Sequence, residues 1–310
     1  MTHLYANDLY YAHLSLYAFA ARWARGAAVL DVGCGSGYGG AYLARHGARH
    51  VTGVDVDPGA VAFAARHWGA DIRFEVMEAS RLAELGAHRF DLVVVLNVLE
   101  HLSDVPAVLA GACATLRPSG TLIAAVPPVT SAEQRLAELA NPHHVNIWSP
   151  RQWRHCLGAY FETVELYRHV LTRPDVVPDF RNAPPDTVLS ERDFDCLPAT
   201  GEGQLAGSFS VVLLARGPME ARRRPPPGAK VMFVDDSFTR VRPWLTPLAP
   251  DLLAAEALPL RSLPARAWAE VRAGGPPALL RATRAWLSWR VRRGLALREL
   301  RRPPPTSGAP

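Results

Sequence analysis

The sequence predicts an α/β fold in which a mostly parallel sheet carries helices on both faces. Three observations support this prediction. Short apolar segments alternate with segments of helical periodicity from residue 29 to residue 126, as in strands joined by crossover helices. Residues 90–96 form an almost continuous apolar run, which is typical of a strand buried on both faces. A glycine-rich turn at residues 33–40 separates the first strand from the helix that follows it.

The glycine-rich turn is the feature around which the chain is organised. An apolar segment that contains Asp31 runs into glycine at alternate positions: Gly33, Gly35 and Gly37. Residues 38–45 then have the pattern of a helix. Glycine permits positive φ and lets a ligand approach the main chain, while the free N–H groups of a helix N-terminus attract anionic or strongly polar groups. We therefore expect a ligand to bind at this turn.

The spacing of the glycines separates two kinds of nucleotide site. A dinucleotide fingerprint requires glycine at the first, third and sixth positions, but the sixth position from Gly33 is Tyr38. The alternate glycines after Asp31 instead resemble the first motif of the class I S-adenosylmethionine (SAM) dependent methyltransferases. Residues 50–55 support the resemblance, because they form a second predicted strand that ends in Asp55, where an adenosine ribose presents its two hydroxyls.

Three later segments resemble the same family in the same order along the chain. They are Glu78-Ala79 after the predicted strand 72–76, the block 97–102 after the strand 90–96, and the turn 117–120 after the predicted helix 105–116. An ordered series of this kind is hard to obtain by chance. The resemblance covers residues 7 to 216, with a gap from about 170 to 207.

The resemblance implies a Rossmann-like class I methyltransferase fold with a seven-stranded, mostly parallel sheet. The fifth strand is expected at 121–126, and the sixth and seventh at 161–167 and 209–216. Residues 171–207 are rich in proline and acid, and we interpret them as a lid or an irregular insertion. Residues 1–216 are assigned to the methyltransferase domain, and 217–310 to a basic, partly helical C-terminal extension.

Local signals place the connecting helices. Residues 58–67 begin with proline, which is favoured at the first helical position. Ser149 and Pro150 predict the cap and first residue of another helix. Residues 7–23 have helical periodicity, with Asn7 or Asp8 available as a cap.

In the family that the chain resembles, an N-terminal helix often covers the SAM pocket. An aromatic ring on that helix could lie against the sulfonium as a cation–π partner, and the candidates are Tyr10, Tyr11 and Tyr17. For Tyr17, its helical spacing from Leu14 favours packing on the sheet instead.

The resemblance also implies which residues bind the cofactor. They are Tyr11, Asp31, Gly33, Gly35, Gly37, Asp55, Val56, Glu78, Ala79 and Asn97. The glycines open the backbone to the methionine half of SAM, and Asp31 orients its ammonium group or the turn. Asp55 accepts both ribose hydroxyls, Glu78 and Ala79 flank the adenine, and Asn97 lies beside the methionine portion. Glu78 departs from the family, in which Asp is commoner at this position.

Two histidines are candidates for a catalytic base, His144 and His101. Each follows a predicted strand at the ligand edge of the sheet. The pattern Asn141-Pro-x-His144 before a Ser-capped helix resembles methyltransferases that act on small molecules and bacterial glycans, so His144 is the first choice. A structural role beside Glu100 is an equally good interpretation of His101. Positioning can contribute about 7–11 kcal/mol to such a reaction and a base about 3–5 kcal/mol, so a base is optional.

The composition indicates which binding partners and which cellular compartment to expect. Residues 1–217 carry 17 arginines and 22 acidic residues, whereas residues 218–310 carry 17 basic and 7 acidic residues. A nucleic-acid substrate is therefore not expected for the first part of the chain. The four cysteines are scattered, and with the adjacent pair His143-His144 they lack metal-site spacing, so no metal is expected. Reduced thiols, no apolar stretch of about 18 residues and no secretion signal favour a cytoplasmic protein.

The C-terminal extension has its own pattern. Residues 277–302 resemble a basic helix, interpreted as a surface helix or one that docks on a protein partner, and Trp286 and Trp289 also suggest a peripheral membrane contact.

The predicted function is a SAM-dependent methyltransferase that acts on a small-molecule or saccharide acceptor, with oxygen as the expected acceptor atom. Two alternatives remain. One is a non-catalytic SAM-binding scaffold or regulatory protein. The other is an NAD-dependent oxidoreductase, which Tyr38 disfavours.

Overall fold

The computed structural model describes residues 3–131, 134–135, 138, 141, 143–172 and 189–220, with side chains from Tyr10 onward. The chain divides into one unit of residues 1–130 and 149–234 and another of residues 131–148 and 235–310. Every helix and strand named below belongs to the first unit.

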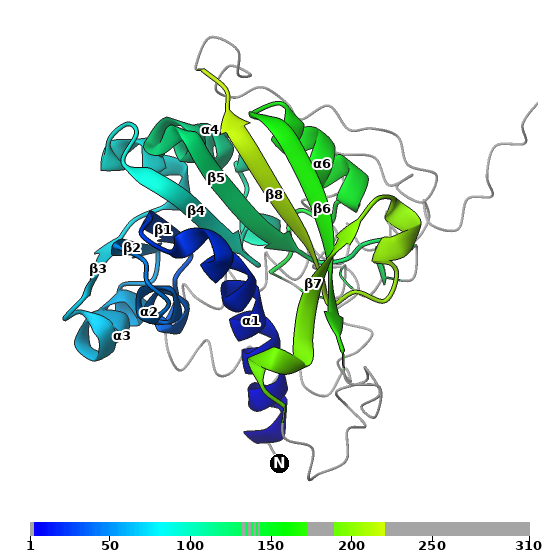
Figure 1. The fold of residues 1–310 in the computed structure, drawn as a ribbon, viewed down its shortest axis with the longest axis horizontal. Helices are drawn as coiled ribbons and strands as arrows, with labels where there is room; N and C mark the ends of the chain where they lie inside the picture. The colour runs from blue at the N-terminus through cyan, green and yellow to red at the C-terminus, as the bar shows by residue number, and fades with distance from the viewer. Residues whose placement is uncertain are drawn as a thin grey trace, which may run out of the picture. The chain divides into compact units, whose positions relative to one another are not determined.

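Eight strands of the described residues form one sheet, in the order β3-β2-β1-β4-β5-β8-β6-β7 (Figure 1). The strands are β1 (Ala28–Val32), β2 (His50–Asp55), β3 (Ile72–Val76), β4 (Phe90–Leu96), β5 (Leu116–Val126), β6 (Phe161–Leu171), β7 (Phe194–Ala199) and β8 (Ser210–Pro218). The first five pair in parallel. Strand β8 is antiparallel to both β5 and β6, and β7 is antiparallel to β6. The prediction of a mostly parallel α/β sheet is confirmed.

The helices are α1 (His3–Ala24), α2 (Tyr38–Arg45), α3 (Pro58–Trp68), α4 (Val105–Thr115) and α6 (Pro150–Gly158). Short 3₁₀ segments are η1 (Ala79–Leu85), η2 (Leu99–His101), η3 (Glu191–Asp193) and η4 (Glu202–Leu205). The predicted cap at Ser149 is confirmed, because its hydroxyl accepts from the backbone N–H of Gln152 while the Gln152 side chain accepts from Ser149 N. The predicted cap of the first helix is wrong: α1 begins at His3, so Asn7 and Asp8 lie inside it.

The expected seven strands are corrected to eight. The additional strand, β7, lies within residues 171–207, which the sequence presented as a lid or an irregular insertion. Strand β6 continues past its predicted end at Tyr167 to Leu171, and its last six residues pair with β7. Residues 194–197 alternate between buried and half-buried, so the strand has an inner and an outer side despite its proline. Residues 173–188 lie outside the described residues.

The turn predicted at residues 117–120 is also corrected. These residues are part of β5, and the pairing of β4 with β5 changes register between Phe90 and Leu92. The additional residues that loop out at this point keep Thr121 paired with Leu92.

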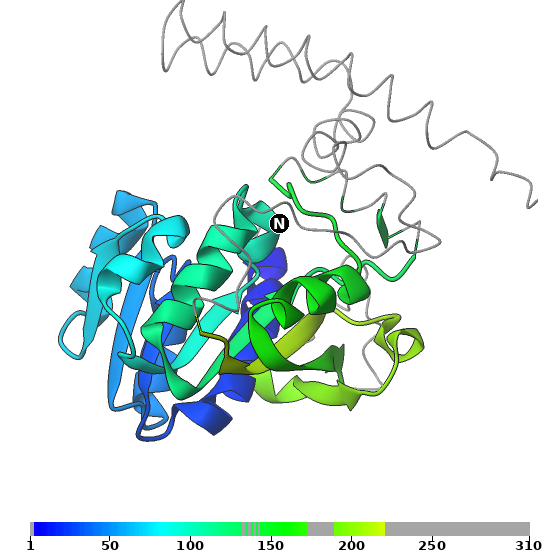
Figure 2. The same cartoon turned by 90° about the horizontal axis from the view of Figure 1, so that it is seen from above.

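The helices cover both faces of the sheet, as predicted. On one face, Leu16 and Phe19 of α1 pack with Leu92 and Ile123 in one cluster of buried residues. Figure 2 shows α4 and α6 on the opposite side of the sheet, where Trp153 of α6 is completely buried. The sheet is therefore enclosed where β1, β4 and β5 cross the middle of the fold.

Three further predictions concern membrane spans, the cysteines and the C-terminal extension. No helix in the described part of the chain is long and apolar enough to cross a membrane. All four cysteines are buried and free. The extension was expected to begin at residue 217, but residues 217 and 218 complete β8. Beyond Glu220 the extension lies outside the described residues, and so does the predicted helix 277–302.

Candidate functional site

The glycine turn links the carboxyl end of β1 to the start of α2. Gly33, Gly35 and Gly37 all have positive φ, at 72°, 51° and 80°. The backbone N–H groups of Gly33 and Cys34 donate to the carbonyl of Val54 at 2.8 and 3.0 Å. The turn is thus fixed against the end of β2, the strand that carries Asp55.

The three glycines meet different surroundings. A Cβ atom at Gly33 would lie 2.5 Å from Val98, and one at Gly37 would lie 2.8 Å from Phe74 and Ala64. A Cβ atom at Gly35 would meet nothing within 4 Å. Gly33 and Gly37 therefore allow close packing, and Gly35 alone borders open space. The sequence had predicted one role for all three.

Asp55 lies directly beside this open part of the turn. Its Oδ2 accepts from the backbone N–H of Gly35 at 2.8 Å, and its Oδ1 accepts from Asp57 at 2.9 Å. A carboxylate has about four lone-pair positions, so each oxygen can accept one more hydrogen bond. These two backbone bonds hold the carboxylate at the edge of the turn with acceptor capacity to spare.

Asp31 lies below the turn and is completely buried. The hydroxyl of Tyr17 donates to its Oδ1 at 3.1 Å, and the backbone N–H of Gly40 also donates to the carboxylate. Burial raises the pKa of Asp31 to about 7, with a further contribution from the charge of Asp55, although the bond from Tyr17 opposes the rise. Of the two predicted roles, this environment favours orientation of the turn over contact with a ligand.

The tyrosines of α1 point to different places. Tyr17 is buried against the turn, in agreement with the preference for packing. Tyr10 is partly exposed, and its ring lies 5.1 Å from the ring of Tyr38, the first residue of α2. Tyr11, the predicted cofactor residue, packs against a separate cluster with Phe194. Tyr10 is therefore better placed beside the glycine turn than Tyr11.

Two exposed valines flank Asp55 at the ends of β2 and β3. Val56 and Val76 are 64% and 56% exposed, which is unusual for large apolar side chains in this fold. Val76 is paired with Asp55 in the register of the two strands. Sequence reasoning identified Val56 but missed Val76, although both follow the same rule: each closes or follows a strand at the ligand edge.

Glu78 and Ala79 come next along the same edge. Glu78 is exposed and Ala79 half-buried, and the Glu78 carboxylate accepts from the Ser80 hydroxyl at 3.4 Å. Glu78 caps η1 and Ala79 begins it, two and three residues beyond Val76, which pairs with Asp55.

Asn97 directly follows β4 and has a left-handed conformation, with φ at 54°. Such a φ is uncommon outside glycine, although asparagine adopts it more readily than most residues. The Asn97 side chain lies 3.5 Å from the hydroxyl of Ser210 at the start of β8. The chain therefore turns sharply at Asn97, and Val98 is brought under Gly33.

The two candidate bases are held in different ways. His101 ends η2, with Nε2 4.0 Å from the buried carboxylate of Glu100, a distance too long for a hydrogen bond. His144 lies in the second unit of the chain, where its Nδ1 is 2.6 Å from Oε2 of Glu138. Glu138 lies six positions before His144 on a segment without a recognisable pattern, so the sequence alone did not single it out.

The strand order, the turn after β1 and the carboxylate at the end of β2 are those of the class I methyltransferase fold. Residues 29–120 match the family model described as a methyltransferase domain. The chain thus contains a domain of the class I SAM-dependent methyltransferases.

Curated relatives share only part of their length with this chain. It is 41% identical over 101 residues to a ubiquinone biosynthesis O-methyltransferase of Neisseria meningitidis serogroup C, covering 31% of this chain and 42% of the relative. It is 34% identical over 150 residues to the protein of the same name from Azorhizobium caulinodans, covering 47% and 58%. The chain therefore spans about half the length of the curated relatives that it matches.

A solved structure supports the fold over a longer stretch. The SAM-dependent methyltransferase of Thermotoga maritima, described as a possible histamine N-methyltransferase, superposes with a TM-score of 0.50. The match covers 67% of this chain and 90% of that one at 16% identity, which supports the fold alone.

Proposed function

We propose that this protein is a SAM-dependent methyltransferase that transfers a methyl group to a small-molecule or saccharide acceptor, with oxygen as the favoured acceptor atom. The observation that carries the proposal is the position of Asp55, whose carboxylate is bonded to the amide of Gly35 beside the open part of the turn. A ligand that carries a ribose with two free hydroxyls, and a polar group close to that ribose, fits beside this carboxylate.

The residues at this edge are compatible with each part of the cofactor. Asp55 can accept from both ribose hydroxyls, because each of its oxygens keeps a free lone pair. Val56 and Val76 offer apolar contacts for the adenine, with Glu78 and Ala79 next to them. The space over Gly35 can receive the methionine half, and Asn97 provides a polar side chain at the end of β4.

When bound, SAM supplies an electrophilic methyl group on a sulfonium. The protein then has to position the acceptor in line with that group, exclude water and remove a proton if the acceptor is a hydroxyl. Tyr10 and Tyr38 supply aromatic surface beside the turn for the first two tasks. His144, held by Glu138, and His101, beside Glu100, are our candidates for the third.

Oxygen is favoured as the acceptor atom because the curated relatives are named O-methyltransferases. The identities of 34–41% support the same kind of reaction on a small molecule. The four cysteines are buried and outside any disulfide, which supports our proposal of a reducing compartment such as the cytoplasm.

The test is cofactor binding followed by product formation. Calorimetry should detect binding of S-adenosylhomocysteine (SAH) and of SAM to the protein, and no heat of binding for NADH. Replacement of Asp55→Asn should weaken SAH binding by about tenfold or more, because an amide is a weaker acceptor than a carboxylate. Asp71→Asn, an exposed residue before β3, is the matched control and should leave the affinity unchanged. Binding of NADH in place of SAH would reverse the proposal.

Mass spectrometry of a panel of phenols, alcohols and saccharides incubated with SAM should then show an added methyl group. Tight SAH binding without any methylated product across the panel would favour the non-catalytic scaffold.

A further inference from the structure

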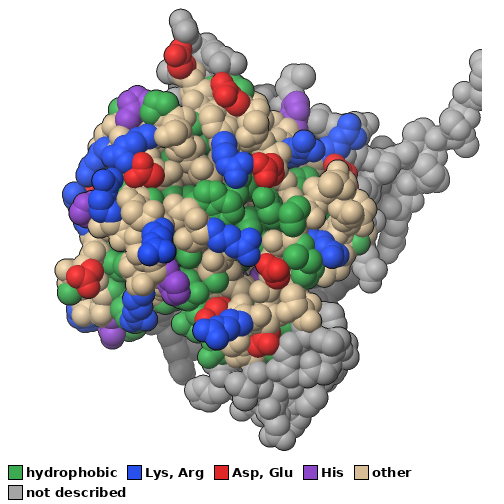
Figure 3. Space-filling view, in the orientation of Figure 1, with side chains coloured by type: hydrophobic (Ala, Val, Ile, Leu, Met, Phe, Trp, Pro, Cys, Tyr) green, Lys and Arg blue, Asp and Glu red, His purple; other side chains and the backbone are tan. Residues whose placement is uncertain are grey.

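Strand β3 is one of the two edges of the sheet, and no other described strand pairs with its outer side. The opposite edge strand, β7, contains Pro198, which has no backbone N–H to offer to a further strand. Strand β3 has no proline. Acidic and basic side chains lie along the left border of the molecule in Figure 3, where Figure 1 places β3. A further strand can therefore pair more completely with β3 than with β7.

The hydrogen bonds to β2 determine which backbone groups of β3 face outward. The N–H of Met77, directly after β3, donates to the carbonyl of Asp55 at 2.9 Å, and Asp55 pairs with Val76 in the parallel register. Alternate residues of a parallel strand bond to the same neighbour, so the odd-numbered residues of β3 bond to β2. The residues that direct their N–H and C=O groups outward are Ile72, Phe74 and Val76.

The side chains of β3 divide into a charged side and an apolar side, because successive side chains of a strand point to opposite faces. Arg73 and Glu75 share one side, with Nε of Arg73 2.7 Å from Oε1 of Glu75. These two side chains are 62% and 26% exposed. On the other side, Phe74 packs against the buried cluster that includes residues of α1 and α2. The exposed side of β3 thus carries one positive and one negative charge, two positions apart.

We infer that two copies of the chain pair through β3, antiparallel and related by a two-fold axis, to form one continuous sheet. Residues that face outward can exchange two hydrogen bonds across an antiparallel pair, and three symmetric registers contain more than one such pair. Two of these registers are centred on Arg73 or on Glu75, and each sets like charges directly opposite, which destabilises a strand pair. The third is centred on Phe74 and uses all three outward-facing residues.

The register centred on Phe74 makes the two strands complementary in charge. Arg73 lies opposite the partner's Glu75, and Glu75 lies opposite the partner's Arg73. The four charges therefore alternate in sign, and each has an opposite neighbour both along its own strand and across the pair. Such a contact is isologous, so it closes after two copies. Ile72 lies opposite the partner's Val76, which keeps apolar side chains together on the other side.

Sedimentation analysis of the full chain tests this inference, and a monomer–dimer equilibrium is expected for the unmodified protein. Arg73→Glu sets acidic side chains opposite each other across the pair, and Glu75→Arg sets basic ones. Each variant alone should weaken dimerisation by about tenfold or more. Arg154→Glu makes the same charge change at an exposed position on α6, which packs on β6 and β8, and should dimerise as the unmodified protein does.

Mixing the two β3 variants distinguishes pairing between chains from an effect within one chain. Strand β3 of Arg73→Glu carries two acidic side chains, and that of Glu75→Arg carries two basic ones. The mixture should therefore form a heterodimer, although each variant dimerises poorly alone. The ion pair within one strand cannot produce this result, because both variants lack it. Added salt should also weaken the dimer of the unmodified protein, a measurement that needs no variant.

An unmodified protein that stays monomeric up to millimolar concentration would overturn the inference. A dimer that neither β3 variant nor salt weakens would do the same, because another surface would then hold it together. A third contrary result is a mixture that stays monomeric when circular dichroism shows both variants to be folded. These measurements use no cofactor, so the inference and the proposed function can fail independently.

Discussion

The hydroxyl of Tyr17 donates a hydrogen bond to Oδ1 of Asp31 at 3.1 Å, and both side chains are buried. The bond joins α1 to β1 directly beneath the glycine turn. The ring of Tyr17 occupies the space that a side chain on Gly39 would need, because a Cβ atom there would lie 2.0 Å from the ring. The turn is therefore supported from below by a helix that precedes it in the sequence.

Asp31→Asn should change how stability depends on pH. The pKa of Asp31 is about 7 in the folded protein, above its ordinary value of 3.8. Its contribution to stability is full below pH 4 and is lost as the pH rises through 7, because only the unfolded carboxyl ionises freely in that range. As the pH rises in this range, the free energy of unfolding of the variant should increase relative to that of the unmodified protein by up to about 1.4 kcal/mol per pH unit.

Urea unfolding at pH 5, 6, 7 and 8 measures this difference. Asp71→Asn serves as the exposed control and should show no such trend. A constant difference between Asp31→Asn and the unmodified protein across these pH values would contradict the burial argument.

Gly39→Ala should destabilise the protein by displacing Tyr17. The added methyl group overlaps the ring, and a shift of Tyr17 removes one of the two donors of the buried Asp31 carboxylate and leaves only the Gly40 N–H, at a cost of about 1–3 kcal/mol. Gly158→Ala, where a Cβ atom would meet nothing within 4 Å, is the comparison. Thermal unfolding of the two variants should separate them, and equal melting temperatures would be evidence against close contact at Gly39.

Gly35→Ala should impair cofactor binding more than stability. The new methyl group would project into the open space proposed for the methionine half of SAM, so SAH affinity should fall by about tenfold or more. The positive φ alone costs about 1–2 kcal/mol. Gly207→Ala has a similar φ and equally open surroundings away from the turn, so it controls for that strain.

Calorimetry with SAH, together with urea unfolding, distinguishes the two effects. If Gly35→Ala and Gly207→Ala bind SAH equally well, the space over Gly35 is not part of the cofactor site.

His169 should make the protein less stable in mild acid. The Ser15 hydroxyl donates to the carbonyl of Ala12, so it accepts from Nε2 of His169 at 2.8 Å. Nδ1 has no partner among the described residues. Burial lowers the pKa of His169 to about 4 from 6.5. The unfolded histidine takes up a proton below pH 6.5, so stability falls as the pH drops from 6.5 to 4.

Replacement by His169→Phe should remove this loss, and an aromatic ring suits the site because Phe194 and Phe209 surround it. The free energy of unfolding at pH 5 relative to pH 7 is the measurement. His67→Phe on the exposed side of α3 should keep the acid loss. An identical acid loss in His169→Phe would assign it to other groups.

Truncation after Glu220 should leave SAH affinity unchanged. Strand β8 runs to Pro218, and the backbone N–H of Met219 donates to the carbonyl of Tyr160 at 2.8 Å. A cut at Arg216, the boundary suggested by the sequence, would remove these contacts. Calorimetry of residues 1–220 is the measurement, and a folded fragment unable to bind SAH would assign the tail to the binding site.

The sequence by itself determined the elements whose signals are local. Glycine at alternate positions fixed the turn and the start of α2, Ser149 fixed the start of α6, and an apolar run fixed β4. Asp55 could be placed as well, because a residue that ends a parallel strand must lie at the ligand edge. These features depend on backbone geometry and periodicity over a few neighbouring residues.

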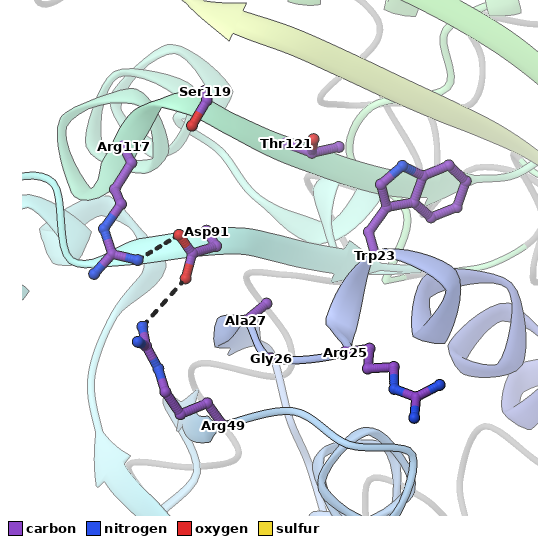
Figure 4. Close-up of a pocket in the computed structure, with 9 residues that line it drawn as sticks. All are labelled: Trp23, Arg25, Gly26, Ala27, Arg49, Asp91, Arg117, Ser119 and Thr121. Carbon is purple, nitrogen blue, oxygen red and sulfur yellow. Dashed lines mark hydrogen bonds and ion pairs between the residues drawn. The ribbon is translucent and has the colours of Figure 1, made fainter.

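Only the tertiary structure decided which distant residues meet. Tyr17 reaches Asp31, Val76 stands opposite Asp55, and β7 pairs with the end of β6. Asp91 likewise brings together Arg49 and Arg117, which precede β2 and begin β5 (Figure 4). Such contacts depend on strand register and on how each helix packs, and a shift of one residue sends a strand's side chains to the other face. Short stretches of sequence do not contain that information.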